Sequence, residues 1–140
     1  MNAAPIGDTK KAKRKVLVVE DDKFLQRIIV MKLSGDDFGA VGASDGEEAL
    51  RLMLADKPDL VILDLILPRM NGFEVLSEMR TNQRLKDVPV IVLSNLGQDE
   101  DISRVKQMGA IDYMTKSNVS IHEVVQKIKE AFAKYLSQKK

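Results

Sequence analysis

The stretch Leu60-Val61-Ile62-Leu63-Asp64 decides the fold of this chain. Its four apolar residues, preceded by Lys57-Pro58-Asp59, indicate a short strand that is buried on both faces. Asp64 ends the strand with a carboxylate, whose burial costs several kcal/mol unless it is paired or bound to a metal. In open parallel sheets, ligands bind beyond the carboxyl ends of the strands, so Asp64 is a candidate site residue. The alternative role, capping the next helix, suits Asn71 better.

Composition is that of a globular protein with one domain. Of 140 residues, 44% are hydrophobic and 31% charged, and no apolar run approaches the ~20 residues that cross a bilayer. The 22 Lys and Arg nearly balance the 21 Asp and Glu, which argues against direct nucleic-acid binding. Cys is absent, and the N-terminus lacks the apolar core of a signal peptide. We expect a cytoplasmic protein without membrane insertion.

Apolar periodicity predicts strands and helices in alternation after a flexible basic tail over residues 1–13. Five strands alternating with five helices imply right-handed crossovers and a parallel sheet covered on both faces. The prediction is a doubly wound α/β domain over residues 14–137, and no effector domain is expected in the short remainder. The predicted strands cover residues 16–19, 39–43, 60–63, 89–93 and 111–115.

Predicted helix starts carry capping residues. Asp22 precedes a helix over residues 23–33, Asn71 precedes a third helix, and Gly109 closes a polar fourth one. The second and last helices begin with capping-box patterns, in which a Glu follows three positions after the cap. The last helix is expected to end near Ser137. The two capping boxes are Asp45 with Glu48 and Ser120 with Glu123.

Charged and hydroxyl groups stand at the ends of four predicted strands, which share one edge of a parallel sheet. Three carboxylates brought together repel one another unless a cation lies among them, and an all-oxygen cluster suits Mg²⁺. A lysine and a serine add a positive charge and a hydroxyl donor. Together these groups fit phosphoryl transfer to an aspartate. They are Glu20, Asp21, Asp64, Ser94 and Lys116.

The same residues stand in motifs that resemble the receiver domains of response regulators in two-component signalling. The resemblance covers about residues 15–135 and depends on an ordered set of motifs. It implies a flavodoxin-like sheet of order 2-1-3-4-5, the order known for the chemotaxis member of this family. The motifs are Val18-Val19-Glu20-Asp21-Asp22, Pro58-Asp59-Leu60-Val61-Ile62-Leu63-Asp64, Leu67-Pro68-Arg69-Met70-Asn71-Gly72, Val90-Ile91-Val92-Leu93-Ser94 and Gly109-Ala110-Ile111-Asp112-Tyr113-Met114-Thr115-Lys116.

The resemblance implies roles for four residues in binding Mg²⁺ and accepting a phosphoryl group. Asp64 would accept a phosphoryl group from a sensor histidine kinase or a phosphotransfer protein. Mg²⁺ would be bound by Asp64 and Asp21 directly, by Glu20 through water, and by the backbone carbonyl of Ile66. The chain would then not be an enzyme but a phosphoacceptor that assists its own phosphorylation and dephosphorylation.

The resemblance also implies roles for three residues in the conformational change that follows phosphorylation. Ser94 and Lys116 would bind phosphoryl oxygens. The movement of Ser94 and the inward rotation of Tyr113 would remodel the surface of the last two helices and the strand between them. That surface would control a downstream protein. Ordinary packing of a strand aromatic remains the alternative for Tyr113.

Other ionisable residues are expected to lie outside this site. Asp59 begins the strand that Asp64 ends, and at ~3.3 Å per residue it lies roughly 16 Å away. Asp22 is interpreted as the cap of the first helix. The alternative is that it supports the two metal-binding acids before it, Glu20 and Asp21. His122, the single histidine, is expected on the surface of the last helix.

Three positions depart from the family pattern. Ser117 stands where the family usually has Pro, so we expect a trans and looser loop around Lys116. Asn95 replaces a smaller residue, and its size is expected to affect phosphodonor entry or water attack. Ile111 stands where many dimerising members carry an acid, so the oligomeric state is left open.

Other functions of an α/β domain fit these residues less well than phosphoryl acceptance. A flavin-phosphate site would need amide donors after the first strand, where Glu20-Asp21-Asp22 would repel a phosphate. An aspartate-nucleophile phosphatase would need an acid at Ile66, and the Walker lysine loop is absent. The main alternative is a receiver-like interaction module that does not signal by phosphate. Whether the chain acts alone or is the receiver of a longer regulator is open.

Overall fold

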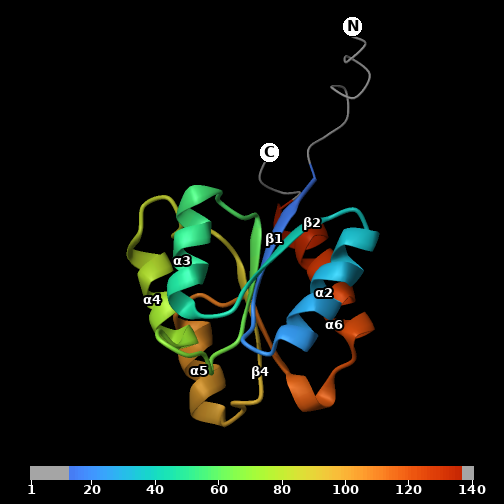
Figure 1. Cartoon of the computed structure of the whole chain (residues 1–140). Coiled ribbons are helices and arrows are strands. Elements are labelled where there is room, and N and C mark those ends of the chain that lie inside the picture. The colour runs from blue at the N-terminus through green and yellow to red at the C-terminus, as the bar shows by residue number, and fades with distance from the viewer. Residues whose placement is uncertain (1–12, 137–140) are drawn as a thin grey trace, which may run out of the picture.

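Five parallel strands form the centre of the molecule in a computed structural model that describes residues 13–136 (Figure 1). They lie in the order β2-β1-β3-β4-β5, which confirms the predicted topology. The predicted tail over residues 1–13 lies outside the described residues except for Lys13. The strands are β1 (Lys15–Val19), β2 (Gly39–Ala43), β3 (Leu60–Leu63), β4 (Val90–Ser94) and β5 (Asp112–Thr115).

Helices cover both faces of the sheet, as the alternation predicted. Figure 1 shows α2 (Lys23–Gly35) and α6 (Ile121–Ala131) on one face. The other face carries α3 (Gly46–Ala55), α4 (Gly72–Thr81) and α5 (Asp99–Gln107). A short 3-10 turn, η1 (Lys116–Asn118), follows β5, and a π-helical turn, η2 (Phe132–Leu136), follows α6.

Alternate residues of the central strands supply the two halves of the core. Leu17, Val61 and Val92 pack toward α3 and α4, whereas Val18 and Ile62 pack toward α2 and α6. β3 is buried along its whole length, as expected for a strand with helices on both sides. Burial on both faces explains why this strand reads as an uninterrupted apolar run.

Most predicted caps form. The Asp22 side chain accepts hydrogen bonds from the N–H groups of Phe24 and Leu25, and Asn71 closes a full capping box at α4. The predicted box at Ser120 is also closed. The capping box predicted at α3 forms only in part. The Asp45 side chain accepts from the N–H of Glu48, but the Glu48 carboxylate accepts from the N–H of Ser44 and not from that of Asp45, so this half of the prediction was wrong.

The first and last helices each have a feature at one end. Phe24, in the first turn of α2, is 75% exposed, although its side chain is apolar. The last α-helix ends at Ala131 and continues only as the π-helical turn η2, in which Phe132 is buried and Tyr135 is 38% exposed. Within residues 13–136, none of the helices has the length and apolar character that spanning a membrane requires.

Candidate functional site

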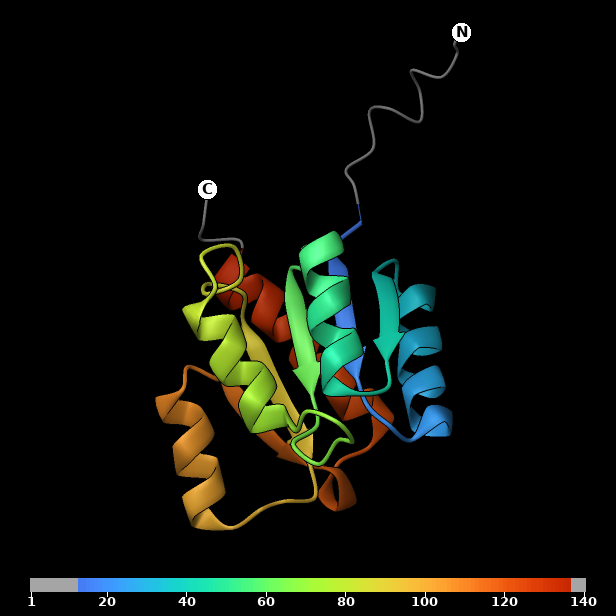
Figure 2. The same ribbon diagram turned by 60° about the vertical axis from the view of Figure 1, so that its left-hand side comes forward.

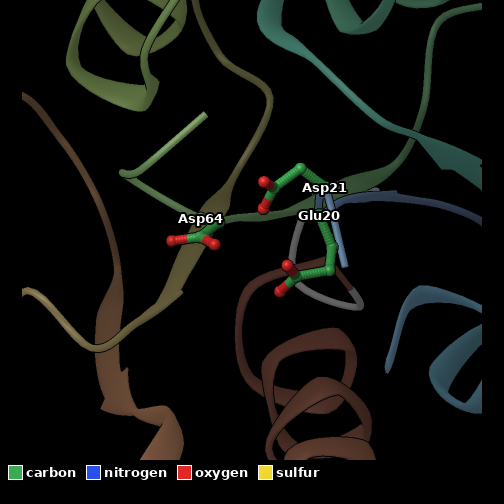
Figure 3. Close-up of side chains that lie close together, drawn as sticks. All are labelled: Glu20, Asp21 and Asp64. Carbon is green, nitrogen blue, oxygen red and sulfur yellow. The ribbon is translucent and has the colours of Figure 1, made fainter. Parts of the chain in front are cut away.

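The carboxyl ends of the strands meet at one edge of the sheet, where Figure 2 shows the arrowheads and the loops that follow them. β1 runs into Glu20 and Asp21, and β3 runs into Asp64. One carboxylate oxygen of each lies within 4.8 Å of the others, and Figure 3 shows the three side chains gathered together. Ser94 ends β4 and Lys116 follows β5, so the topology brings together all five predicted groups.

Asp64 is 3% exposed, and both of its carboxylate oxygens have partners. Oδ1 accepts from the Ser94 hydroxyl over 2.7 Å and from the Ile66 N–H over 3.1 Å. Oδ2 accepts from the Lys116 ammonium over 2.6 Å. These contacts hold the carboxylate at the base of the site with a hydroxyl on one side and a cation on the other.

Ser94 is fully buried between Asp64 and the loops that follow β3 and β4. Its hydroxyl donates to Asp64, and its oxygen lies 3.4 Å from the N–H groups of both Leu65 and Leu96. A hydroxyl can exchange its acceptor by rotation, so Ser94 can donate to an oxygen newly placed on Asp64.

Lys116 bridges two carboxylates. Its Nζ lies 2.6 Å from Oδ2 of Asp64 and 2.6 Å from Oε1 of Glu20. Burial lowers the pKa of Lys116, but hydrogen bonds to Asp64 and Glu20 outweigh this effect, so the pKa is raised above the ordinary lysine value. The site therefore has a permanent positive charge at neutral pH.

Glu20 is 2% exposed, and its oxygens differ in their partners. Oε2 accepts from the Asp22 N–H over 2.9 Å, whereas Oε1 is a buried atom that pairs with the Lys116 ammonium over 2.6 Å. Burial raises the pKa of Glu20, and the hydrogen bond of Lys116 only partly offsets this rise. A buried carboxylate oxygen with spare capacity beside the exposed carboxylate of Asp21 fits a divalent cation with oxygen ligands.

Tyr113 lies half-buried on β5, and its hydroxyl is buried without a hydrogen-bond partner among residues 13–136. Burial raises the pKa of Tyr113, and the charges of Asp101 and Asp64 raise it further. A buried hydroxyl without a partner lacks the hydrogen bond that it would make in water, so this position of the ring costs free energy.

The residues expected outside the site lie outside it. Asp59 is at the opposite end of β3, where its carboxylate accepts from the Lys15 N–H over 2.8 Å. Asp22 caps α2, although its N–H also supports Glu20. His122 is exposed in the first turn of α6.

Sequence reasoning missed the side chains that brace the site from other elements. Gln26 of α2 donates to the carbonyls of Glu20 over 2.8 Å and Ala43 over 3.0 Å, which ties β1 to β2 beside the acidic pair. Arg69, in the loop after β3, pairs with Asp45 at the start of α3 over 3.3 Å. A polar residue on an amphipathic helix resembles any solvated residue in sequence, so no local signal identified these contacts.

The Lys116-Ser117 peptide is trans, as expected without a proline there, since the described residues contain no cis peptide bond. The Ser117 N–H donates to Oδ1 of Asn95 over 3.0 Å. Both departures from the family pattern noted in this region are therefore in contact with each other. Ile111, the third departure, is half-buried before β5, and its N–H donates to the Val90 carbonyl over 2.8 Å.

Comparison with known proteins places these observations in one family. Residues 16–129 match the family described as response regulator receiver domain. The receiver domain of the Francisella response regulator 1452 is similar in structure, with a TM-score of 0.78 and 30% identity over 86% of this chain and 98% of that chain. The Vibrio cholerae chemotaxis protein CheY4 has a TM-score of 0.79 at 25% identity, with 85% of this chain and 98% of that chain covered.

Curated relatives are longer proteins. The probable transcriptional regulator ycf27 of Guillardia theta is 41% identical over 106 residues, which are 76% of this chain and 41% of that protein. The alkaline phosphatase synthesis transcriptional regulatory protein PhoP of Bacillus subtilis is 36% identical over 105 residues, which are 74% of this chain and 42% of PhoP. The chain thus spans about two fifths of the length of these relatives.

Proposed function

The chain belongs to the response regulator receiver domain family, and on this premise we propose that it is a phosphorylation-dependent signalling switch whose phosphoacceptor is Asp64. The observation that carries the proposal is the contact set of Asp64: a buried carboxylate with a hydroxyl donor on one oxygen and an ammonium on the other. These are the groups that an acyl phosphate on Asp64 requires.

The proposed reaction transfers a phosphoryl group from the phosphohistidine of a histidine kinase or a phosphotransfer protein. An oxygen of Asp64 attacks phosphorus, the bond from phosphorus to the imidazole nitrogen breaks, and the imidazole takes up a proton. Lys116 and Ser94 then bind phosphoryl oxygens. Because Lys116 already contacts Asp64, little reorganisation is needed when the negative charge arrives.

A magnesium ion would offset phosphoryl charge during this transfer, and the acidic cluster is suited to hold it. Asp21 and Asp64 would bind the ion directly and Glu20 through water. The backbone carbonyl of Ile66 would complete the protein ligands, which agrees with a side chain there that is apolar and 55% exposed. Attack of a water molecule on the phosphorus would break its bond to the Asp64 oxygen, release inorganic phosphate and return the carboxylate, so the domain would assist its own dephosphorylation.

The output proposed for this switch is a change of the face formed by α5, β5 and α6, which would control a downstream protein. The new phosphoryl group would take the Ser94 hydroxyl as a partner, and Tyr113 would rotate in response. The hydroxyl of Tyr113, buried without a partner, supports a ring with an alternative position. The cytoplasmic location and the absence of direct nucleic-acid contact stay predictions, as does the identity of the partner.

The test is a mass measurement. Purified protein would be incubated with Mg²⁺ and acetyl phosphate, and intact masses compared among the wild type, Asp64→Asn and the matched control Asp59→Asn at the other end of β3. We expect one Mg²⁺-dependent, hydroxylamine-sensitive phosphoryl adduct on the wild type and the control, and none on Asp64→Asn. No adduct on the wild type would overturn the proposal in favour of a docking module independent of phosphate.

A further inference from the structure

Asn95 and Ser117 connect the loops that follow β4 and β5. The ladder between these strands ends at the pair Ser94 and Thr115. Beyond that pair, the backbone N–H of Ser117 donates to the side-chain Oδ1 of Asn95 over 3.0 Å. A side-chain oxygen thus continues the connection between two parallel strands past the point where their backbones stop pairing.

This contact flanks Lys116. Thr115, the residue before Lys116, is held by its pairing with Ser94 in the ladder. Ser117, the residue after Lys116, is held by the hydrogen bond to Asn95. Lys116 opens η1, a 3-10 turn of three residues without a side-chain cap. The side chain must nevertheless reach Asp64 and Glu20, each at 2.6 Å.

We propose that Asn95 is a positioning residue for phosphoryl transfer, holding the Ser117 amide so that the Lys116 ammonium stays over Asp64. This inference rests on the proposed function. It assigns a role to the Asn95 side chain and to the backbone of Ser117, whereas the Ser117 side chain is not needed. Any residue with a backbone N–H would serve at position 117, and proline would not.

Both residues of the contact are exposed, so its loss is expected to change global stability little. Its effect should appear in the rate of a reaction that depends on the placement of Lys116, because displacements near 1 Å in a catalytic group reduce rates strongly. The acidic pair Glu20 and Asp21 follows β1, whereas Asn95 and Ser117 follow β4 and β5, so binding of Mg²⁺ should be independent of the contact.

The test measures the rate of Asp64 phosphorylation by acetyl phosphate at saturating Mg²⁺. We expect Asn95→Ala to slow the rate at least threefold, while Ser117→Ala, which keeps the N–H, leaves it unchanged. In a Lys116→Met background, followed over longer times, Asn95→Ala should cause no further slowing, because the group that it positions is gone. The Mg²⁺ affinity of Asn95→Ala, from thermal unfolding, should equal that of the wild type.

Several results would contradict the inference. Equal rates for Asn95→Ala and the wild type would overturn the positioning role alone. If Asn95→Ala slowed the reaction equally in the wild-type and Lys116→Met backgrounds, Asn95 would not act through Lys116. If Asn95→Ala weakened the Mg²⁺ affinity, the substitution would disturb the whole site and not the position of Lys116 alone. No phosphoryl adduct on the wild type would overturn the proposed function itself, and with it this role.

Discussion

Gly72 shows at the scale of one residue how tightly the backbone is packed beneath Asp64. Its N–H donates to the Leu65 carbonyl over 3.0 Å, and a Cβ at this position would collide with the carbonyl oxygen of Asp64 and lie 2.6 Å from Cα of Leu65. Both atoms belong to backbone, which cannot move without moving the acceptor. The glycine after Asn71 is therefore required by the close approach of α4 to the end of β3.

We predict that Gly72→Ala destabilises the protein by about 1–3 kcal/mol and slows phosphorylation of Asp64. The matched control is Gly35→Ala at the end of α2, where an added Cβ meets nothing within 4 Å and alanine should be neutral or stabilising by about 0.5–1 kcal/mol. Urea unfolding of both variants measures the difference. Equal stabilities would show that the backbone relaxes around Gly72 at no cost.

At the scale of an element, α5 is attached to the molecule mainly through its C-terminal half. Val105 is its one buried residue, and no side chain caps its start. Two residues of α4 contact this half of α5. The Phe73 ring centroid lies 4.1 Å from the Arg104 guanidinium. Arg80 donates hydrogen bonds to carbonyls at the end of α5 and in the loop before β4. Those carbonyls are Met108, Gly109, Lys86 and Val88, at 2.9 to 3.2 Å.

We predict that Arg80→Ala costs about 1–3 kcal/mol of stability and speeds amide hydrogen exchange in the last turn of α5, because four backbone carbonyls lose a charged donor. Burial lowers the pKa of Arg80, yet the guanidinium stays charged at neutral pH, so the effect should not vary between pH 6 and 8. Arg51→Ala, which removes an exposed arginine of α3, is the control and should change stability by less than about 0.5 kcal/mol. Unchanged exchange in α5 would contradict the role of Arg80.

At the scale of the whole molecule, the acidic edge links folding stability to pH and to Mg²⁺. Burial raises the pKa of Glu20 in the folded state, so without a metal the stabilising contribution of the protonated group is lost as the pH rises through that raised pKa. A bound cation reverses this preference because it requires the ionised carboxylates. Metal binding and protonation therefore compete at the same edge of the sheet.

We predict that Mg²⁺ at 100 times its Kd stabilises the protein by about 2.7 kcal/mol at pH 7, and by less as the pH falls through the pKa of Glu20. Thermal unfolding with and without Mg²⁺ at pH 7 and pH 5 measures this difference. Asp21→Asn should lose most of the Mg²⁺ effect, and Asp59→Asn should keep it. A Mg²⁺ effect of equal size at both pH values and in both variants would indicate binding elsewhere.

The sequence by itself determined the layers and the place of the site. Residues 60–63 read as a doubly buried strand because burial on two faces demands an uninterrupted apolar run, and Asp22, Asn71 and Ser120 marked helix starts because caps are local. Parallel strands share one carboxyl edge, so Glu20, Asp21 and Asp64 could be placed together without coordinates. The strand order came from resemblance to a family and was confirmed by the structure.

Only the tertiary structure decided which side chains hold that edge in place. Gln26 and Asn95 act through hydrogen bonds to residues 6 to 22 positions away in the chain, and such partners leave no periodic pattern in the sequence. The double contact of Lys116 with Glu20 and Asp64 depends on where three strands end relative to one another. Local patterns specify elements, whereas the geometry that governs the charge of the site arises when distant loops pack together.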